Sequence, residues 1–249
     1  MSISVSVSAV IVAAGQGRRM KTSAKLPKQF LPIGGIPILA HSLMAFERSE
    51  LVDEIVLVTG EELRSPCEKI VHRYHIQKLS TIVAGGQERQ ASVWNGLQTV
   101  NPQTEIVVIH DAVRMFVTEA MLVDSVREAR IHGACVVAVP VKDTIKQGVV
   151  CHPEEEDVSG SSGEVFVKET FDRNALWQIQ TPQTFRCDLI RDLHKRAAAL
   201  QLQVTDDAML AEHFGHAVKI VSGSYRNIKI TTPDDLLIAE AFWQDERGN

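Results

Sequence analysis

The residues best suited to chemistry lie in a glycine-rich turn that follows the first apolar segment. Residues 13–20 read Ala-Ala-Gly-Gln-Gly-Arg-Arg-Met. Gly15 and Gly17 allow tight turns and a close approach of the backbone, and successive backbone N–H groups in such a loop form a concave anion site. Arg18 and Arg19 follow Gly17 directly, and Lys28 comes a short distance further along. The segment therefore predicts a phosphate-binding loop with cations beside it.

Other kinds of site fit the sequence less well. A dinucleotide-binding GxGxxG turn would need glycine where Met20 stands, and the ribose-binding acidic residue expected about 20 residues after the turn is missing, which disfavours an NAD-dependent oxidoreductase. The nine histidines show no HExxH spacing, and the four cysteines form no CxxC pair, which disfavours zinc and disulfides. Unpaired cysteines predict a reducing compartment, so we expect a cytoplasmic protein.

Composition limits the partners and predicts one globular unit. The 249 residues are 45% hydrophobic and 23% charged, and we expect a single domain over residues 1–249. The net charge of −5 predicts no general attraction to nucleic acid or to an anionic membrane. No apolar run approaches the length of about 20 residues that spans a bilayer. The apolar start reads as a first strand rather than as a signal peptide.

Short β-branched runs alternate with amphipathic helical patterns, and this alternation indicates how the turn is positioned. Five nearly continuous apolar runs suit strands buried on both faces of a parallel sheet, namely residues 7–13, 54–58, 81–84, 105–109 and 134–139. Helical spacing of apolar residues lies between them. Repeated β-α-β units predict an α/β fold with a doubly wound, mostly parallel sheet, of the Rossmann-like kind.

The second half of the chain breaks the alternation and then resumes it. Residues 142–173 are polar, with two short alternating strands around a flexible tip, and predict a projecting β-hairpin arm. We expect a helix over 185–199, and strands at 218–221 and 227–230. Thr205 is predicted to cap a helix that starts at Asp206. Thr-Pro-Asp-Asp at 232–235 is typical of a further helix start.

Several motifs in consistent order resemble those of one enzyme family. The opening turn with Pro27-Lys28-Gln29 resembles the signature of sugar-phosphate nucleotidyltransferases. Four later segments are similar to the 2-C-methyl-D-erythritol 4-phosphate cytidylyltransferase family: Gly85-Gly86-x-Glu88-Arg89-x-x-Ser92, His110-Asp111-Ala112-Val113-Arg114, Asp172-Arg173-Asn174 with Thr181-Pro182-Gln183, and Thr205-Asp206-Asp207 with Asn227-Ile228-Lys229. Together the motifs cover nearly the whole chain, which makes the resemblance far more specific than any one of them.

The resemblance implies a transfer of CMP from CTP to 2-C-methyl-D-erythritol 4-phosphate, with release of pyrophosphate. It implies that Arg19 and Lys28 neutralise charge on the attacked phosphate, and that Arg173 and Lys229 orient the acceptor phosphate. The implied CTP contacts are Ala13, Ala14, Gly15, Gly17, Gly85, Gly86 and Ser92. The implied acceptor contacts are Asp111, Arg114, Thr144, Thr181 and Thr205. Mg²⁺ is expected on the CTP phosphates without a dedicated protein site, and the arm is expected to form a homodimer.

Three alternatives stay open at this point. A ribitol 5-phosphate cytidylyltransferase would share the fold and differ in its acceptor. A non-catalytic nucleotide-binding module would keep the fold without the chemistry, although Arg19 and Lys28 speak against it. Each residue also has a plainer role: Lys28 and Arg173 as surface cations, Asp111 as a helix cap, or Lys229 as a solvent-facing residue of an edge strand.

Overall fold

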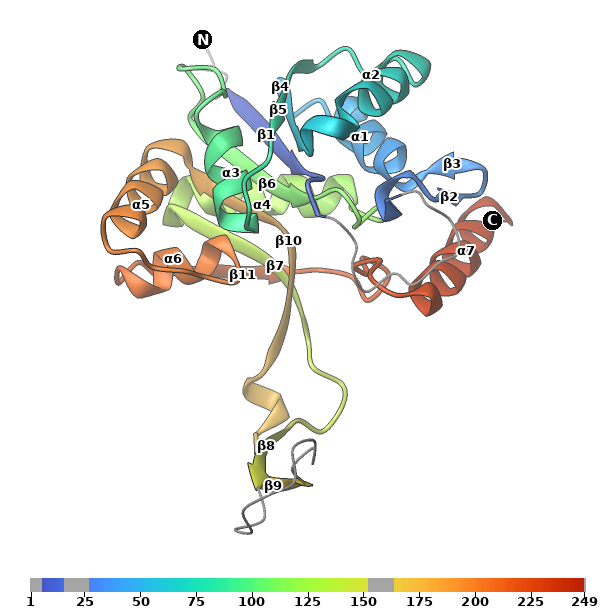
Figure 1. Ribbon diagram of the computed structural model, residues 1–249. Coiled ribbons are helices and arrows are strands. Elements are labelled where there is room, and N and C mark those ends of the chain that lie inside the picture. The colour runs from blue at the N-terminus through green and yellow to red at the C-terminus, as the bar shows by residue number, and fades with distance from the viewer. Residues whose placement is uncertain (1–5, 16–26, 152–163, 249) are drawn as a thin grey trace, which may run out of the picture.

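The computed structural model describes residues 6–15, 27–151 and 164–248, and its centre is a seven-stranded sheet (Figure 1). The strand order is β11-β7-β10-β6-β1-β4-β5. The strands are β1 (Val7–Val12), β4 (Glu54–Thr59), β5 (Leu79–Ala84), β6 (Ile106–Asp111), β7 (Ala134–Pro140), β10 (Trp177–Arg186) and β11 (Lys219–Ser222). All pairs are parallel except those of β10, which runs antiparallel to β6 and β7. The predicted mostly parallel α/β sheet is confirmed.

Helices cover both faces of this sheet, so the strands are buried on both sides. One face carries α1 (Ile38–Arg48), α2 (Arg64–Arg73) and α4 (Glu119–His132), and the other carries α3 (Arg89–Leu97), α5 (Cys187–Ala199) and α6 (Asp207–His213). Alternate side chains of β1 enter the two cores: Ile11 packs in the cluster of Leu43, and Val10 in that of Leu97. Near-continuous apolar runs are what such two-sided burial requires.

The chain reverses its direction of winding at β1. From β1 it proceeds to β4 and β5 on one side, and then crosses to β6 on the other side. In open α/β sheets, ligands bind at the carboxyl ends of the strands at such a switch point. The segment after β1, the segment after β5 and the last residue of β6 therefore meet at one edge of the sheet.

A smaller unit packs beside this edge of the sheet. It comprises the 3₁₀ helix η1 (Lys28–Phe30), the hairpin of β2 (Pro32–Ile33) and β3 (Ile36–Pro37), and the helix α7 (Pro233–Gly248). Ile33, Phe116 and Ala239 share its core. Thr232 and Asp235 cap α7 reciprocally, with the Thr232 backbone N–H donating to Asp235 at 2.8 Å, as the sequence predicts. Another 3₁₀ helix, η2 (Glu61–Leu63), leads into α2. Within the described segments, no helix is long and apolar enough to cross a bilayer.

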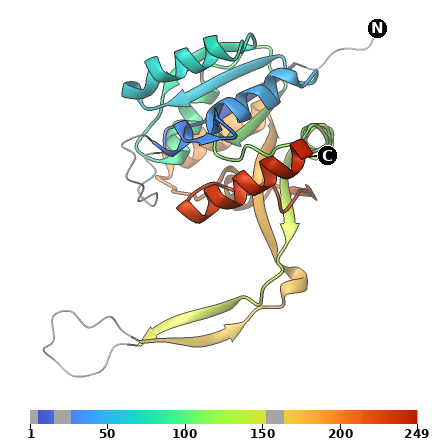
Figure 2. The same ribbon diagram turned by 90° about the vertical axis from the view of Figure 1, so that its right-hand side faces the viewer.

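The predicted arm is present and extends away from the sheet (Figure 2). Its strands are β8 (Lys146–Cys151) and β9 (Glu164–Thr170), paired antiparallel, and the 3₁₀ helix η3 (Arg173–Ala175) lies at its base. Val165, Phe166 and Val167 are 69%, 52% and 61% exposed, so the arm leaves apolar surface uncovered in the single chain. The tip, residues 152–163, lies outside the described residues.

Three local predictions are wrong. Phe185 is not helical: it is fully buried in β10, and the helix begins at Cys187. Residues 227–230 form an irregular segment rather than a strand, because Asn227 uses its amide to hold the Thr181 carbonyl at 2.9 Å. The cap of α6 is Asp206, whose carboxylate accepts from the Met209 backbone N–H, and Thr205 precedes it.

Candidate active site

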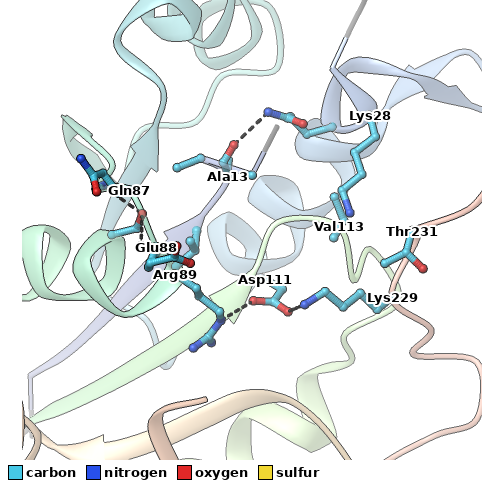
Figure 3. Close-up of a pocket in the computed structure, with 15 residues that line it drawn as sticks. Ala13, Lys28, Gln87, Glu88, Arg89, Asp111, Val113, Lys229 and Thr231 are labelled. Carbon is cyan, nitrogen blue, oxygen red and sulfur yellow. Dashed lines mark hydrogen bonds and ion pairs between the residues drawn. The ribbon is translucent and has the colours of Figure 1, made fainter. Parts of the chain in front are cut away.

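A cavity of about 450 Å³ opens where the ends of β1, β5 and β6 meet (Figure 3). Its walls come from segments that are far apart in the sequence: the turn after β1, η1, the β5–α3 loop, the end of β6 and the segment before α7. Eight residues that the sequence singles out line this one cavity, namely Ala13, Ala14, Gly15, Lys28, Gly86, Ser92, Asp111 and Lys229.

The first wall is the turn after β1 with η1 behind it. The Ala13 N–H donates to the Val58 carbonyl at 2.7 Å, which continues the β1–β4 pairing into the turn. Gln29, only 1% exposed, donates its side-chain amide to the Ala13 carbonyl at 2.8 Å. Lys28 lies along one wall of the cavity and donates to the Ile230 carbonyl at 3.0 Å (Figure 3). The turn thus has a fixed start and an ammonium group beside it. Gly17 and Arg19 lie outside the described residues.

The second wall is the loop between β5 and α3, and it has no room for larger residues. A Cβ on Gly85 would lie 2.4 Å from the Ala14 Cβ, and one on Gly86 would lie 2.4 Å from the Ala91 Cβ. The buried Ser92 hydroxyl accepts from the Gly86 N–H at 3.0 Å and donates to the Glu88 carbonyl at 3.1 Å. Both glycines are therefore required by close packing, and Ser92 fixes the shape of the loop.

The floor of the cavity is a cluster of alternating charges. Lys229 Nζ lies 2.7 Å from Asp111 Oδ2, and Arg89 Nε lies 3.2 Å from the other oxygen, Oδ1 (Figure 3). Arg89 Nη1 lies 2.6 Å from Asp207 Oδ2, and Asp207 Oδ1 lies 3.3 Å from His194 Nε2. The Asp111 side chain is 9% exposed and that of Asp207 is 1% exposed. Two buried carboxylates are thus joined by one guanidinium group.

The electrostatics of this cluster keep its charges in place. Burial by itself acts to raise the pKa of Asp111, but the charges of Arg89 and Lys229 outweigh it, and the pKa lies well below its usual range. In the same way, Arg89 and His194 overcome burial and lower the pKa of Asp207. The pKa of Arg89 is raised, because the two carboxylates outweigh the effect of burial. At neutral pH Asp111 is therefore an anion.

The remaining predicted residues lie away from the cavity of their own chain. Arg114 turns away and donates to the Asn227 carbonyl at 2.8 Å. Thr181 is buried behind Asp111 and accepts from its backbone N–H at 3.1 Å. Two residues, Thr144 and Arg173, are exposed at the base of the arm, where Arg173 donates to the Lys142 carbonyl at 3.2 Å. Thr205 is exposed just before α6.

Arg89 and Gln29 are parts of the site to which the sequence assigns no role. Both lie inside motifs that the sequence shows, Gly-Gly-x-Glu-Arg and Pro-Lys-Gln, so the motifs could have pointed to them. The sequence does not show the partner of Arg89, because Asp207 lies 118 positions away and only the fold brings the two together.

The described residues include no group of three or more His, Cys, Asp or Glu side chains placed to hold a metal ion. Glu88 and Asp111 are the carboxylates that line the described cavity, and both oxygens of Asp111 are within ion-pair distance of cations. Such a donor set fits an ion that brings ligands of its own, as Mg²⁺ on a triphosphate does.

The doubly wound sheet, with a glycine turn and cations at its switch point, places the chain in the class of nucleotide-binding α/β proteins. The family model described as 2-C-methyl-D-erythritol 4-phosphate cytidylyltransferase matches residues 7–245. The chain belongs to this family, and the resemblance seen in the motifs is confirmed.

Individual relatives agree over nearly the whole chain. The 2-C-methyl-D-erythritol 4-phosphate cytidylyltransferase of Geobacillus kaustophilus is 45% identical over 234 residues, which are 94% of this chain and 95% of that protein. The enzyme of the same name from Geobacter metallireducens is 45% identical over 97% of this chain and 99% of its own length. Among solved structures, the 4-diphosphocytidyl-2C-methyl-D-erythritol synthase of Anaerococcus prevotii matches with a TM-score of 0.80 at 32% identity, covering 97% of each chain.

Proposed function

We propose that this protein transfers CMP from CTP to 2-C-methyl-D-erythritol 4-phosphate, giving 4-diphosphocytidyl-2-C-methyl-D-erythritol and pyrophosphate in non-mevalonate isoprenoid synthesis. An oxygen of the acceptor phosphate attacks the α-phosphorus of CTP, and the bond from that phosphorus to the bridging oxygen breaks. One observation carries the proposal beside the family match: a single cavity at the switch point joins the glycine turn, Lys28 and the Asp111–Lys229 pair.

The nucleotide occupies the side formed by the turn and the β5–α3 loop. The triphosphate lies along the backbone of residues 13–17, with Lys28 and Arg19 beside the phosphates that gain charge. Gly85, Gly86 and Ser92 face the cytosine. A wrong base would leave the hydrogen-bonding groups of this tight loop unpaired, which disfavours its binding. The hydrogen bonds of the Ser92 hydroxyl to Gly86 and Glu88 support this role, since they fix the shape of the loop.

The acceptor occupies the side formed by Asp111 and Lys229. A phosphate monoester is an anion near neutral pH, so it needs orientation more than deprotonation. Lys229 orients that phosphate, and Asp111 binds the sugar-alcohol hydroxyl groups. Arg114 and Thr181 support this side from behind, because Thr181 accepts from the Asp111 N–H and Arg114 holds the segment that carries Lys229.

Mg²⁺ is proposed to enter with CTP, held mainly by phosphate oxygens and water. When bound, it neutralises the phosphates and makes the pyrophosphate a better leaving group. Glu88 and Asp111 are the only carboxylates among the described lining residues, so the protein's own share of its ligands is small. The buried free thiols of Cys67, Cys135 and Cys187 support a cytoplasmic location.

The protein is further proposed to act as a homodimer through its arms. Thr144 and Arg173 lie at the arm base and outside the lining of their own chain's cavity, and the arm exposes Val165, Phe166 and Val167. Docking of the arm on a second copy would cover this surface and bring Arg173, with Thr144, to the acceptor bound by the partner subunit. Thr205 would be a further contact of the acceptor.

Mixing two inactive variants tests this arrangement. Lys28→Met and Arg173→Ala subunits are unfolded together and refolded as a mixture. If Arg173 serves the partner's site, a mixed dimer holds one intact site, with Lys28 from one chain and Arg173 from the other, and activity returns. If Arg173 serves its own chain, every site keeps one defect, and no activity returns. Sedimentation velocity establishes the dimer independently.

Pyrophosphate release tests the proposed reaction itself. The protein is incubated with Mg²⁺ and CTP, and with either 2-C-methyl-D-erythritol 4-phosphate or ribitol 5-phosphate. We expect a higher kcat/KM with the methylerythritol acceptor and little turnover when ATP or GTP replaces CTP. A preference for ribitol 5-phosphate would reassign the acceptor, and absence of turnover with both would leave a nucleotide-binding module.

A further inference from the structure

The ammonium group of Lys229 has two partners to serve, Asp111 and the acceptor phosphate. In the structure its ammonium group lies 2.7 Å from Asp111, whereas the proposed function, on which this inference rests, requires it to meet the acceptor phosphate. Once Lys229 turns toward that phosphate, its pairing with Asp111 weakens. A carboxylate buried as deeply as Asp111, only 6% exposed as a residue, is strongly unfavourable without a counter-ion. Something other than Lys229 must hold this charge during the reaction.

Arg89 is placed to do so from the opposite side. Its Nε lies 3.2 Å from Asp111 Oδ1, the oxygen that Lys229 does not contact. Arg89 is the first residue of α3 and its side chain is 22% exposed, so it reaches the cavity from the helix start. The two cations therefore bind different oxygens of one carboxylate, and either can leave without displacing the other.

The position of Arg89 is fixed independently of the substrate. Its Nη1 lies 2.6 Å from Asp207, which is 1% exposed and also contacts His194. The backbone N–H of Asp207 donates to Gln183 Oε1 at 3.0 Å, which ties α6 to β10. His194 stacks on Trp94 with ring centroids 5.9 Å apart. The guanidinium group is thus anchored in the packed face of α3, α5 and α6.

We propose that Arg89 is a positioning residue, which holds Asp111 in place and ionised while Lys229 passes from Asp111 to the acceptor phosphate. Asp207 is the anchor of Arg89 and takes no part in substrate contact. The planar fork of arginine suits this role, because it reaches two carboxylates at once, and a lysine of similar reach offers one point of charge.

The test separates acceptor effects from nucleotide effects. Arg89→Gln is predicted to lower kcat/KM for the acceptor by about 10–100-fold, as loss of a supporting hydrogen-bond partner commonly does. The KM for CTP should change by less than about threefold. Arg89→Lys should recover part of the loss. Arg191→Gln is the matched control. Arg191 is also half-buried, its guanidinium donates to the carbonyls of Leu97 and Val100, and it does not line the cavity.

A double-mutant cycle then distinguishes positioning from general support of the fold. If Arg89 acts through Asp111, adding Arg89→Gln to Asp111→Asn should cost less than about threefold in acceptor kcat/KM. An equal loss with and without the Asp111 carboxylate would overturn the proposal, and so would an unchanged acceptor kcat/KM in folded Arg89→Gln. If Arg89→Gln does not fold, Arg89→Lys, which keeps the charge, is put through the same cycle and judged by the same two outcomes.

Wild-type turnover separates this inference from the proposed function. If the wild type releases no pyrophosphate with any acceptor, the proposed function fails, and the role of Arg89 fails with it. If the wild type turns over and the cycle shows additivity, only the role of Arg89 is overturned.

Discussion

Replacing Lys28 by methionine should reduce turnover far more than it reduces stability. Methionine keeps most of the apolar stem and removes the ammonium group, which in the structure lies on the cavity wall with Nζ 3.0 Å from the Ile230 carbonyl. A preorganised donor aimed at charge that develops in the transition state contributes about 2.7–4 kcal/mol, so kcat should fall about 10²–10³-fold.

The stability cost of the same change is small by comparison. Lys28 is half-buried, and its substitution removes a charge-assisted hydrogen bond to the Ile230 carbonyl. A loss of about 1 kcal/mol is expected, which lowers Tm by about 2–4 °C in a chain of this size. An activity measured at 25 °C should therefore report chemistry rather than unfolding.

The assay follows pyrophosphate release with saturating acceptor and varied Mg-CTP. Lys195→Met is the control, because Lys195 is an exposed lysine of α5 outside the cavity lining. We expect the control to match the wild type. Undiminished kcat in Lys28→Met would refute the role of the ammonium group, and a fall confined to KM for CTP would show ground-state binding rather than transition-state stabilisation.

Two further predictions concern pH and packing. Complete burial lowers the pKa of His110 to about 4, so between about pH 6.5 and 4 the unfolded state binds the proton and the folded state does not. The free energy of unfolding should therefore fall by about 3 kcal/mol as pH drops through this window. The lowered pKa of His41 acts in the same direction. Urea unfolding at pH 7 and pH 4.5 measures the slope, and an equally steep slope in His110→Gln would contradict its origin. Gly96→Ala should destabilise by about 1–3 kcal/mol, because its Cβ would lie 2.5 Å from Val10 Cγ1 and 2.9 Å from Val58 Cγ2; urea unfolding with unchanged stability would show that α3 can shift away.

The sequence predicts those elements whose pattern is set by their own burial. The parallel strands are continuous apolar runs because both faces are covered, and their ends match the expected ranges closely. The strand β10 escaped prediction because Trp177–Arg186 is rich in glutamine and threonine and contains Pro182, which argues against a central strand. Its place comes from distant pairing with β6 and β7, and the register shifts between Ile179 and Gln183, around that proline.

The same distinction applies to the site. Backbone features such as the glycine turn and the Gly85-Gly86 loop are encoded in a few adjacent residues and can be recognised locally. The ion pairs cannot be recognised locally. The pair of Lys229 and Asp111 depends on how an irregular segment lies against β6, and the pair of Arg89 and Asp207 depends on the position of α6. The roles of Thr144 and Arg173 stay predictions, since they require the position of a second chain.

The arrangement of charges also explains how a chain of net charge −5 can bind polyanions. Among the described lining residues, Lys28, Arg89 and Lys229 are the cations, and each has an oxygen partner in the structure: the Ile230 carbonyl, Asp207 with Asp111, and Asp111. Partners of this kind prevent the cations from repelling one another before substrate arrives. Under the proposed function, a phosphate oxygen replaces a carbonyl or carboxylate oxygen, so binding exchanges one oxygen partner for another and requires little reorganisation. In this proposal the half-buried lysines make the exchange, whereas Arg89, anchored on Asp207, stays behind to hold Asp111.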